Sequence, residues 1–80
     1  MIYLEKIEVN NEYVKYYYFE RKDKGKGVLI YFPQKGLCRT EKLCEGDSEV
    51  LEMLRRNAFI RLMKYVKENK YPETDMVAWG

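Results

Sequence analysis

The sequence has no histidine, and only two cysteines, two prolines and one tryptophan among its 80 residues. Histidine is the most common general base, triad base and zinc ligand, so its absence leaves serine, threonine and cysteine without their usual activating partner. Pairs of acids such as Glu5 with Glu8 are typical of solvated surfaces rather than of a catalytic carboxylate pair. We therefore expect no enzymatic activity, no metal and no other cofactor.

A long apolar run is also missing. No stretch approaches the roughly 20 apolar residues that cross a bilayer. The first residues, Met1 to Lys6, already include charges where a signal peptide would have an apolar core. The expected location is the cytoplasm, without membrane contact.

Cys38 and Cys44 are too few to build a disulfide scaffold. The simplest interpretation is two partly buried thiols that behave as small apolar side chains. The alternative is a disulfide between them, which requires residues 36–46 to fold back on themselves.

The length and composition fit one small folded domain that spans residues 1–80. A hydrophobic content of 46% is enough for a core, although domains of this size often gain stability from a partner. Fifteen basic and thirteen acidic residues give a net charge of +2. This balance is not by itself a signature of nucleic-acid binding.

Alternating and aromatic segments in the N-terminal half predict an antiparallel sheet built from β-hairpins. Asn10-Asn11 is expected to form a two-residue turn, because asparagine tolerates positive φ. The polar, glycine-containing residues 23–27 form the second hairpin loop. The predicted strands are residues 2–9, 12–21 and 28–32, the last being central and buried on both faces.

Pro33 ends the third strand because it cannot donate a hydrogen bond to a neighbouring strand. The following residues, 34–46, allow two arrangements. They form either two weakly paired strands around Thr40-Glu41 or one bulged strand.

Residues 48–69 have the periodicity of one long amphipathic helix. Asp47 or Ser48 is expected to cap its start, and Asn69 and Pro72 mark its end. The stripe expected to face the sheet consists of Leu51, Leu54, Ala58, Leu62, Tyr65 and Val66, with Phe59 at its margin.

The tail from Thr74 to Gly80 contains an apolar segment that is expected to dock on the core as a short strand. The predicted fold class is therefore α+β. It consists of an antiparallel sheet of three to four strands packed on one long amphipathic helix, with a possible short C-terminal strand.

Tyrosines are densest in the second predicted strand, and they raise two hypotheses. In an extended strand Tyr16 and Tyr18 share one face, while the opposite face carries Tyr13, Lys15, Tyr17, Phe19 and Arg21. One face of this strand must pack against the helix. The other face is free to act as a protein interface, and tyrosine is enriched in such interfaces. Alternatively, exposed tyrosines stack bases. The characteristic RNA-binding aromatic motif is missing, which favours packing or an interface.

The predicted helix carries a second candidate contact. Met53 and Ile60 lie seven residues apart, away from the apolar stripe, and Arg56 lies between them. Apolar residues two turns apart are typical of a helix that meets a partner helix. The surrounding basic residues fit an acidic or nucleic-acid partner.

From residue 31 onward the chain resembles the N-terminal domain of HicB-like antitoxins. The similarity lies in Phe32-Pro33 with Gly36 and Cys38, in Gly46-Asp47-Ser48 before a helix, and in Tyr71-Pro72-Glu73 after it. Gly36 stands two residues before Cys38 instead of next to it, and the segment from Cys38 to Gly46 is longer than the family pattern. The resemblance implies a partial RNase H-like sheet with one helix and no catalytic acids. It also implies self-association and a protein partner such as a small RNase toxin.

The predicted function is a non-catalytic module for protein–protein interaction, either HicB-like and antitoxin-like or an inhibitor encoded by a mobile element. A homodimer is one form of this hypothesis. The predicted partner contacts are Tyr16, Tyr18, Met53, Arg56 and Ile60. The alternative is a small domain that binds single-stranded nucleic acid through Tyr16, Tyr18, Lys22, Lys24 and Lys26.

Overall fold

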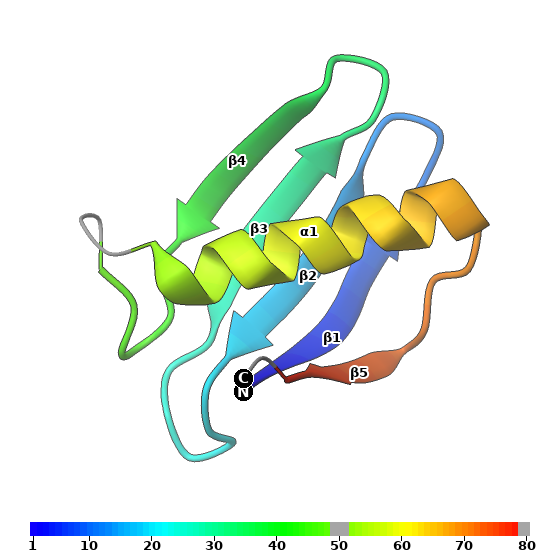
Figure 1. Ribbon diagram of the computed structural model, residues 1–80. Helices are drawn as coiled ribbons and strands as arrows, with labels where there is room; N and C mark the ends of the chain where they lie inside the picture. Colours follow the sequence, from blue (N-terminus) through cyan, green and yellow to red (C-terminus); the bar gives the residue numbers. More distant parts are fainter. Residues whose placement is uncertain (49–51, 79–80) are drawn as a thin grey trace.

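The computed structural model describes residues 1–48 and 52–78. Over these residues one helix packs against a five-stranded antiparallel sheet (Figure 1). The elements in chain order are β1 (Ile2–Val9), β2 (Val14–Phe19), β3 (Gly27–Phe32), β4 (Leu37–Lys42), α1 (Met53–Glu68) and β5 (Thr74–Val77). The predicted α+β class is confirmed, including the short C-terminal strand.

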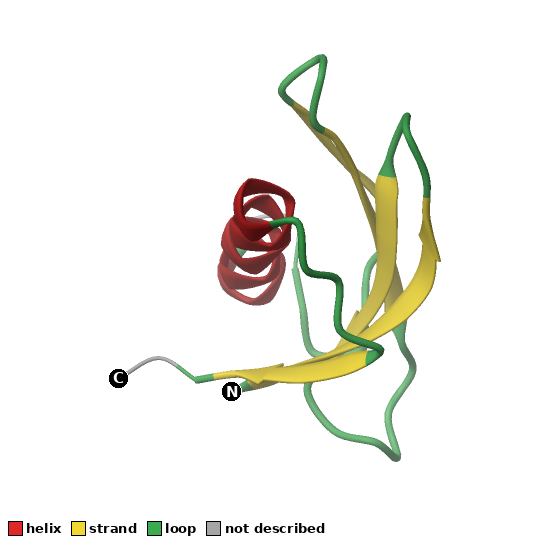
Figure 2. Cartoon of the chain, turned by 90° about the vertical axis from the view of Figure 1, so that its right-hand side faces the viewer, coloured by secondary structure: helices red, strands yellow, loops and turns green. Residues whose placement is uncertain are grey.

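The strands lie in the order β4-β3-β2-β1-β5. Hairpins connect β1 to β4 in sequence, so each of these strands pairs with the next one. After α1 the chain reaches the far edge of the sheet, where β5 pairs antiparallel with β1. The helix crosses one face of the sheet, and no described element covers the other face (Figure 2). The two faces therefore have different roles.

The first hairpin turn is displaced by one residue from its predicted position. The amide of Asn10 donates to the carbonyl of Tyr13 at 3.0 Å, so Asn11 and Glu12 are the central residues. Neither has a positive φ. The prediction that Asn10-Asn11 uses positive φ is wrong, because the Asn10 side chain instead accepts the amides of Glu12 and Tyr13 at 2.8 and 2.9 Å.

Of the two arrangements proposed for residues 34–46, the bulged strand is the one found. Strand β4 is continuous from Leu37 to Lys42, and its register with β3 shifts by one residue next to Val28 and Leu29. It does not fold back, and both Cys38 and Cys44 are free thiols. The alternative of a disulfide is therefore wrong for this structure.

Helix α1 begins later than predicted. Its first residue is Met53, and the capping position is Glu52, which has a left-handed backbone (φ 54°) and no side-chain cap. Asp47 stands six residues before Met53, and its Oδ2 accepts a hydrogen bond from Tyr18 at 2.6 Å. The start predicted at residues 48–51, including Leu51 of the stripe, lies largely outside the described residues.

The end of α1 matches the sequence. The helix ends at Glu68, and Asn69 adopts a left-handed conformation whose amide donates to the carbonyl of Val66 at 3.2 Å. The predicted stripe faces the sheet. Its members Leu54, Ala58, Leu62 and Tyr65 are buried, with Val66 and Phe59 partly buried beside them.

The core lies between α1 and the sheet. Half of its buried side chains come from alternate positions of β1, β2 and β3, as expected for a sheet with one covered face. Strand β3 was predicted to be central and buried on both faces. Its residues Leu29 and Ile30 are buried, but Tyr31 and Phe32 are only partly buried. The middle strand of the sheet is β2, and β3 lies between β2 and the edge strand β4.

Candidate functional site

Tyr16 and Tyr18 lie in the core under α1 and are fully buried. The ring of Tyr16 packs at 5.3 Å from the ring of Tyr65 on the helix. Neither tyrosine can touch a protein partner or stack on a base while α1 is in place. Their prediction as contact residues, for protein or for nucleic acid, is wrong, because the helix covers this face and not the opposite one.

The hydroxyl groups of these two tyrosines explain why they suit the core. Tyr18 donates to Oδ2 of Asp47 at 2.6 Å and accepts the amide of Cys44 at 3.1 Å. Tyr16 donates to the carbonyl of Pro72 at 2.6 Å. Burial raises the pKa of both phenols well above its usual value. The two hydroxyls therefore fix the loop before α1 and the loop after it.

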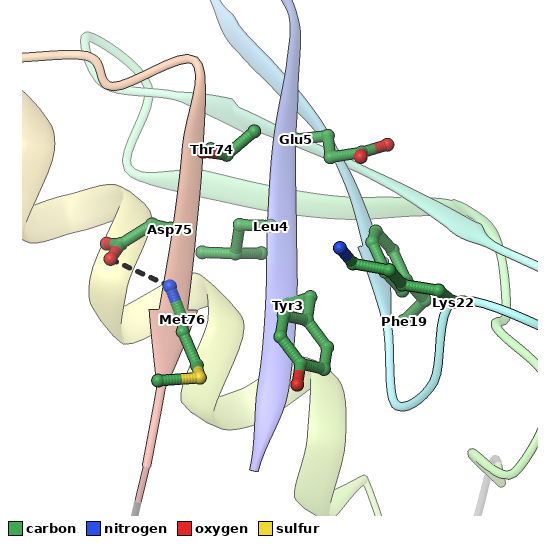
Figure 3. A pocket seen from close by; sticks show the side chains of 8 residues that line it. All are labelled: Tyr3, Leu4, Glu5, Phe19, Lys22, Thr74, Asp75 and Met76. Carbon is green, nitrogen blue, oxygen red and sulfur yellow. Dashed lines mark hydrogen bonds between the residues drawn. The ribbon is translucent and has the colours of Figure 1, made fainter.

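The three lysines proposed to bind phosphate cannot act with Tyr16 and Tyr18, because both of these rings are buried. Lys24 pairs with Glu20 at 3.4 Å, and Lys26 pairs with Glu5 at 2.6 Å. Lys22 lies at the rim of a pocket on the uncovered face of the sheet (Figure 3).

The uncovered face of the sheet carries the aromatic residues that alternate with Tyr16 and Tyr18. The rings of Tyr3 and Phe19 stack with their centroids 5.6 Å apart. The ammonium of Lys26 lies 5.3 Å from the ring centroid of Tyr17 and 5.0 Å from that of Phe19. The resident lysine thus occupies the ring faces that a base would need.

A cavity of about 380 Å³ opens on this face between β5, β1 and β2. Tyr3, Glu5, Thr74 and Met76 border it, as Figure 3 shows. The phenol of Tyr3, the carboxylate of Glu5 and the thioether of Met76 suit contact with a surface that is partly polar and partly apolar.

The exposed side of α1 brings together the other predicted contact residues. Met53 and Ile60 are 53% and 59% exposed, and Arg56 between them is exposed as well. Met63, one turn after Ile60, is 42% exposed and belongs to the same side. The sequence-based prediction of Met53 and Ile60 did not include Met63, although its spacing of three residues from Ile60 is the usual signal of a shared helix face.

A groove of about 450 Å³ runs between this side of α1 and strand β4. Of the β4 residues beside it, Cys38 and Thr40 are only partly buried. The residues that line the groove are Cys38, Thr40, Glu52, Arg55, Arg56, Phe59, Ile60 and Met63. Burial raises the pKa of the Cys38 thiol, so the groove does not activate it as a nucleophile.

At the other end of α1, a carboxylate organises the start of β5. Asp75 accepts a hydrogen bond from the hydroxyl of Tyr65 and pairs with Arg61 at 3.1 Å. Burial acts to raise the pKa of Asp75, but the hydrogen bonds from Tyr65 and from the Met76 amide, with the charge of Arg61, outweigh it and lower that pKa. This cluster joins helix to strand.

Metal ligands do not gather in the part of the chain that the structure describes: residues 1–48 and 52–78 contain no group of three or more Cys, Asp or Glu side chains able to hold an ion. Within the same residues, no helix has both the length and the apolar character needed to cross a membrane.

Comparisons of the chain with protein-family models, with curated proteins and with solved structures give no match, so its candidate sites rest on its own geometry.

Proposed function

We propose that this chain is a non-catalytic binding module that contacts a protein partner through the exposed side of α1. The observation that carries the proposal is the grouping on one helix of Met53, Ile60 and Met63, three of the eight exposed large apolar side chains among the described residues. Covering the exposed part of each would contribute on the order of 1 kcal/mol. The adjoining groove beside β4 offers a recess for an apolar side chain of the partner.

An antitoxin-like or inhibitor role is the specific form of this proposal, and the HicB-like turn motifs support it. Phe32-Pro33 lies at the end of β3, Gly36 has the positive φ (59°) that favours glycine in a turn, and Tyr71-Pro72-Glu73 leads into β5. The motif Gly46-Asp47-Ser48 stands several residues before the first residue of α1. A second copy of the chain is one candidate for the protein partner.

Free thiols at Cys38 and Cys44 support a reducing compartment such as the cytoplasm.

A nucleic-acid function remains the alternative, but with different residues. Tyr3 and Lys22 border the pocket on the uncovered face of the sheet, where a base and a phosphate could be accommodated. The ion pair between Lys26 and Glu5 reduces the charge that this face offers to phosphate. The protein-binding proposal therefore has the stronger support.

A capture experiment separates the two functions. The tagged protein is incubated with nuclease-treated lysate of its source organism, alongside the variants Ile60→Asp and Met76→Asp, and retained proteins are identified by mass spectrometry. Both variants add one negative charge at a site that is half exposed, 59% for Ile60 and 51% for Met76, but on different surfaces. Sedimentation of the purified protein shows whether it self-associates.

We expect a protein in stoichiometric amount with the wild type and with Met76→Asp, and its loss with Ile60→Asp. Loss with Met76→Asp alone would move the interface to the uncovered face of the sheet. Recovery of nucleic acid from untreated lysate, with no protein and with release at higher salt, would refute the proposal in favour of the alternative.

A further inference from the structure

The charges of the chain are distributed very unevenly. From Met53 to Glu68 the helix has five basic residues and one acidic residue, Glu68, whereas the rest of the chain has the other ten basic residues and the other twelve acidic ones. The basic residues are Arg55, Arg56, Arg61, Lys64 and Lys67. Although the whole chain has a net charge of only +2, the helix itself is strongly positive.

Part of this positive charge is neutralised within the fold and part is not. Arg55 pairs with Glu52 at 3.4 Å, and Arg61 pairs with Asp75 at 3.1 Å. Arg56, Lys64 and Lys67 are exposed, and no carboxylate in residues 1–48 or 52–78 pairs with any of them. Their free cations lie on the same helix as the exposed apolar residues.

We infer that the exposed side of α1 and the groove beside β4 bind an acidic amphipathic helix of a protein partner. This inference rests on the proposed function and specifies the chemistry of the partner. Apolar side chains of that helix would lie against Ile60 and Met63 in the groove, and its carboxylates would reach Arg56, Lys64 and Lys67. Complementary charge around an apolar centre is the usual anatomy of a specific protein interface.

A helix fits this surface better than an added strand. Strand β4 is an edge strand, but its register shift breaks the regular pairing, and its exposed residues Arg39, Glu41 and Lys42 are charged. Bulges and charges are the features with which edge strands resist pairing with another chain. In contrast, the spacing of seven and three residues from Met53 to Ile60 to Met63 matches contacts between helices.

The arrangement also favours protein over nucleic acid and membrane. A phosphate backbone needs only cations, and it would leave Ile60 and Met63 exposed in the complex. A membrane surface is usually bound by a helix with a wide apolar face that contains large aromatic or leucine side chains. The wide apolar face of α1, with Leu54 and Leu62, is already buried against the sheet.

The test uses three labelled helical peptides of about 14 residues, which is four helical turns. The first has Leu at the a and d positions of its heptads and Glu on its flanks. The second replaces each Leu with Ser, and the third replaces each Glu with Lys. Fluorescence anisotropy measures their binding to the intact protein, and circular dichroism follows the helicity of the bound peptide.

Two protein variants with the same change in net charge serve as test and control. The test variant, Arg56→Glu with Lys64→Glu and Lys67→Glu, reverses the free cations of α1. The control reverses three exposed basic residues elsewhere: Arg21→Glu, Lys35→Glu and Lys42→Glu.

We expect the wild type and the control variant to bind the Leu/Glu peptide at least about tenfold more tightly than either altered peptide, with a gain of helicity. Exposed charge pairs contribute little individually, so the test variant should lose on the order of tenfold in affinity for this peptide. It should also gain preference for the Leu/Lys peptide. That exchange of specificity would not follow from a variant that merely unfolds.

Several results would overturn the inference. They are equal binding of the Ser/Glu and Leu/Glu peptides, a gain of strand instead of helix, and no binding at peptide concentrations near 1 mM, which corresponds to only about 4 kcal/mol. Tighter binding of a single-stranded oligonucleotide or of anionic phosphatidylglycerol vesicles, lost in the same test variant, would also overturn it. If no peptide binds while Ile60→Asp still abolishes capture of a natural partner, the acidic helix is wrong and the proposed function stands.

Discussion

Replacing Tyr18 with phenylalanine removes one oxygen atom from the centre of the fold. That oxygen donates to Oδ2 of Asp47 and accepts the amide of Cys44, and so it connects β2 to the loop before α1. The aromatic ring keeps its place in the core. The substitution thus isolates the two hydrogen bonds from the packing.

The cost follows from what is left unpaired. The amide of Cys44 loses its acceptor in a buried environment, which costs about 1–3 kcal/mol. The bond from a phenol to a carboxylate contributes about 1.5–3 kcal/mol, but Asp47 is only partly buried and water can replace part of it. We therefore expect Tyr18→Phe to lower the free energy of unfolding by about 2–3 kcal/mol.

Urea unfolding followed by far-ultraviolet circular dichroism measures this loss. With a slope near 1 kcal/mol per M for a chain of this size, the midpoint should fall by about 2–3 M. Tyr17→Phe is the matched control, because Tyr17 lies one residue away on the uncovered face and is 38% exposed. It should change stability by less than about 0.5 kcal/mol. Equal effects of the two substitutions would refute the burial and bonding assigned to Tyr18.

Three further predictions concern other parts of the fold. Asp75→Asn should destabilise the protein by about 1–2 kcal/mol at neutral pH. Because the folded-state pKa of Asp75 is lowered, its contribution is present above the pKa of an unfolded carboxyl, 3.8, and is lost as the pH falls through the folded value. In urea titrations at several pH values, the stability difference between wild type and variant should therefore stay constant from neutral pH down to about pH 4 and shrink progressively below it; a difference that does not shrink below that pH would contradict this. Burial raises the pKa of both thiols, so their alkylation at neutral pH should be slow. Cys38 should react first, and Cys44 should react only after unfolding, because it is the more buried of the two. Equal alkylation rates of the two thiols, followed by mass spectrometry, would count against the burial of Cys44. Gly27→Ala should cost about 3 kcal/mol or more in thermal unfolding, because its Cβ would lie within 2.6 Å of backbone atoms, whereas Gly25→Ala, with neighbours at 3.8 Å, should be within about 0.5 kcal/mol of wild type.

Local signals predicted the elements well where the local physics dominates. Pro33 follows the last residue of β3 because it lacks the amide that a strand needs, and Asn69 ends α1 because it tolerates a left-handed backbone. The apolar stripe through Ala58 and Leu62 also fixed which side of the helix packs. Each of these depends on a few neighbouring residues.

The start of the helix shows where local signals are not enough. Asp47 has the chemistry of a cap, but the described helix begins six residues later, and the Asp47 carboxylate accepts a hydrogen bond from Tyr18, 29 positions away in sequence. A buried hydroxyl needs an acceptor, and here a residue distant in sequence supplies it. Nothing within the segment itself indicates that contact.

For the candidate site, the sequence identified the exposed pair Met53 and Ile60 correctly, because helical periodicity separates the buried stripe from the opposite side. The sequence could not show that Met63 lies beside Cys38 and Thr40 of β4 in one groove. The position of β4 next to the helix depends on how the sheet packs against α1, which no local pattern indicates.

The sequence by itself determined that the second strand has two different aromatic faces, because side chains alternate in a strand. Only the tertiary structure decided which face the helix covers. Burying Tyr16 and Tyr18 lets their hydroxyls bond to Pro72 and Asp47. Burying the opposite face would instead desolvate Lys26 and Glu5, whose charges water now solvates in part. That difference in desolvation favours burial of the face that carries Tyr16 and Tyr18. With these two tyrosines buried, the exposed side of α1 is the candidate contact surface for a protein partner.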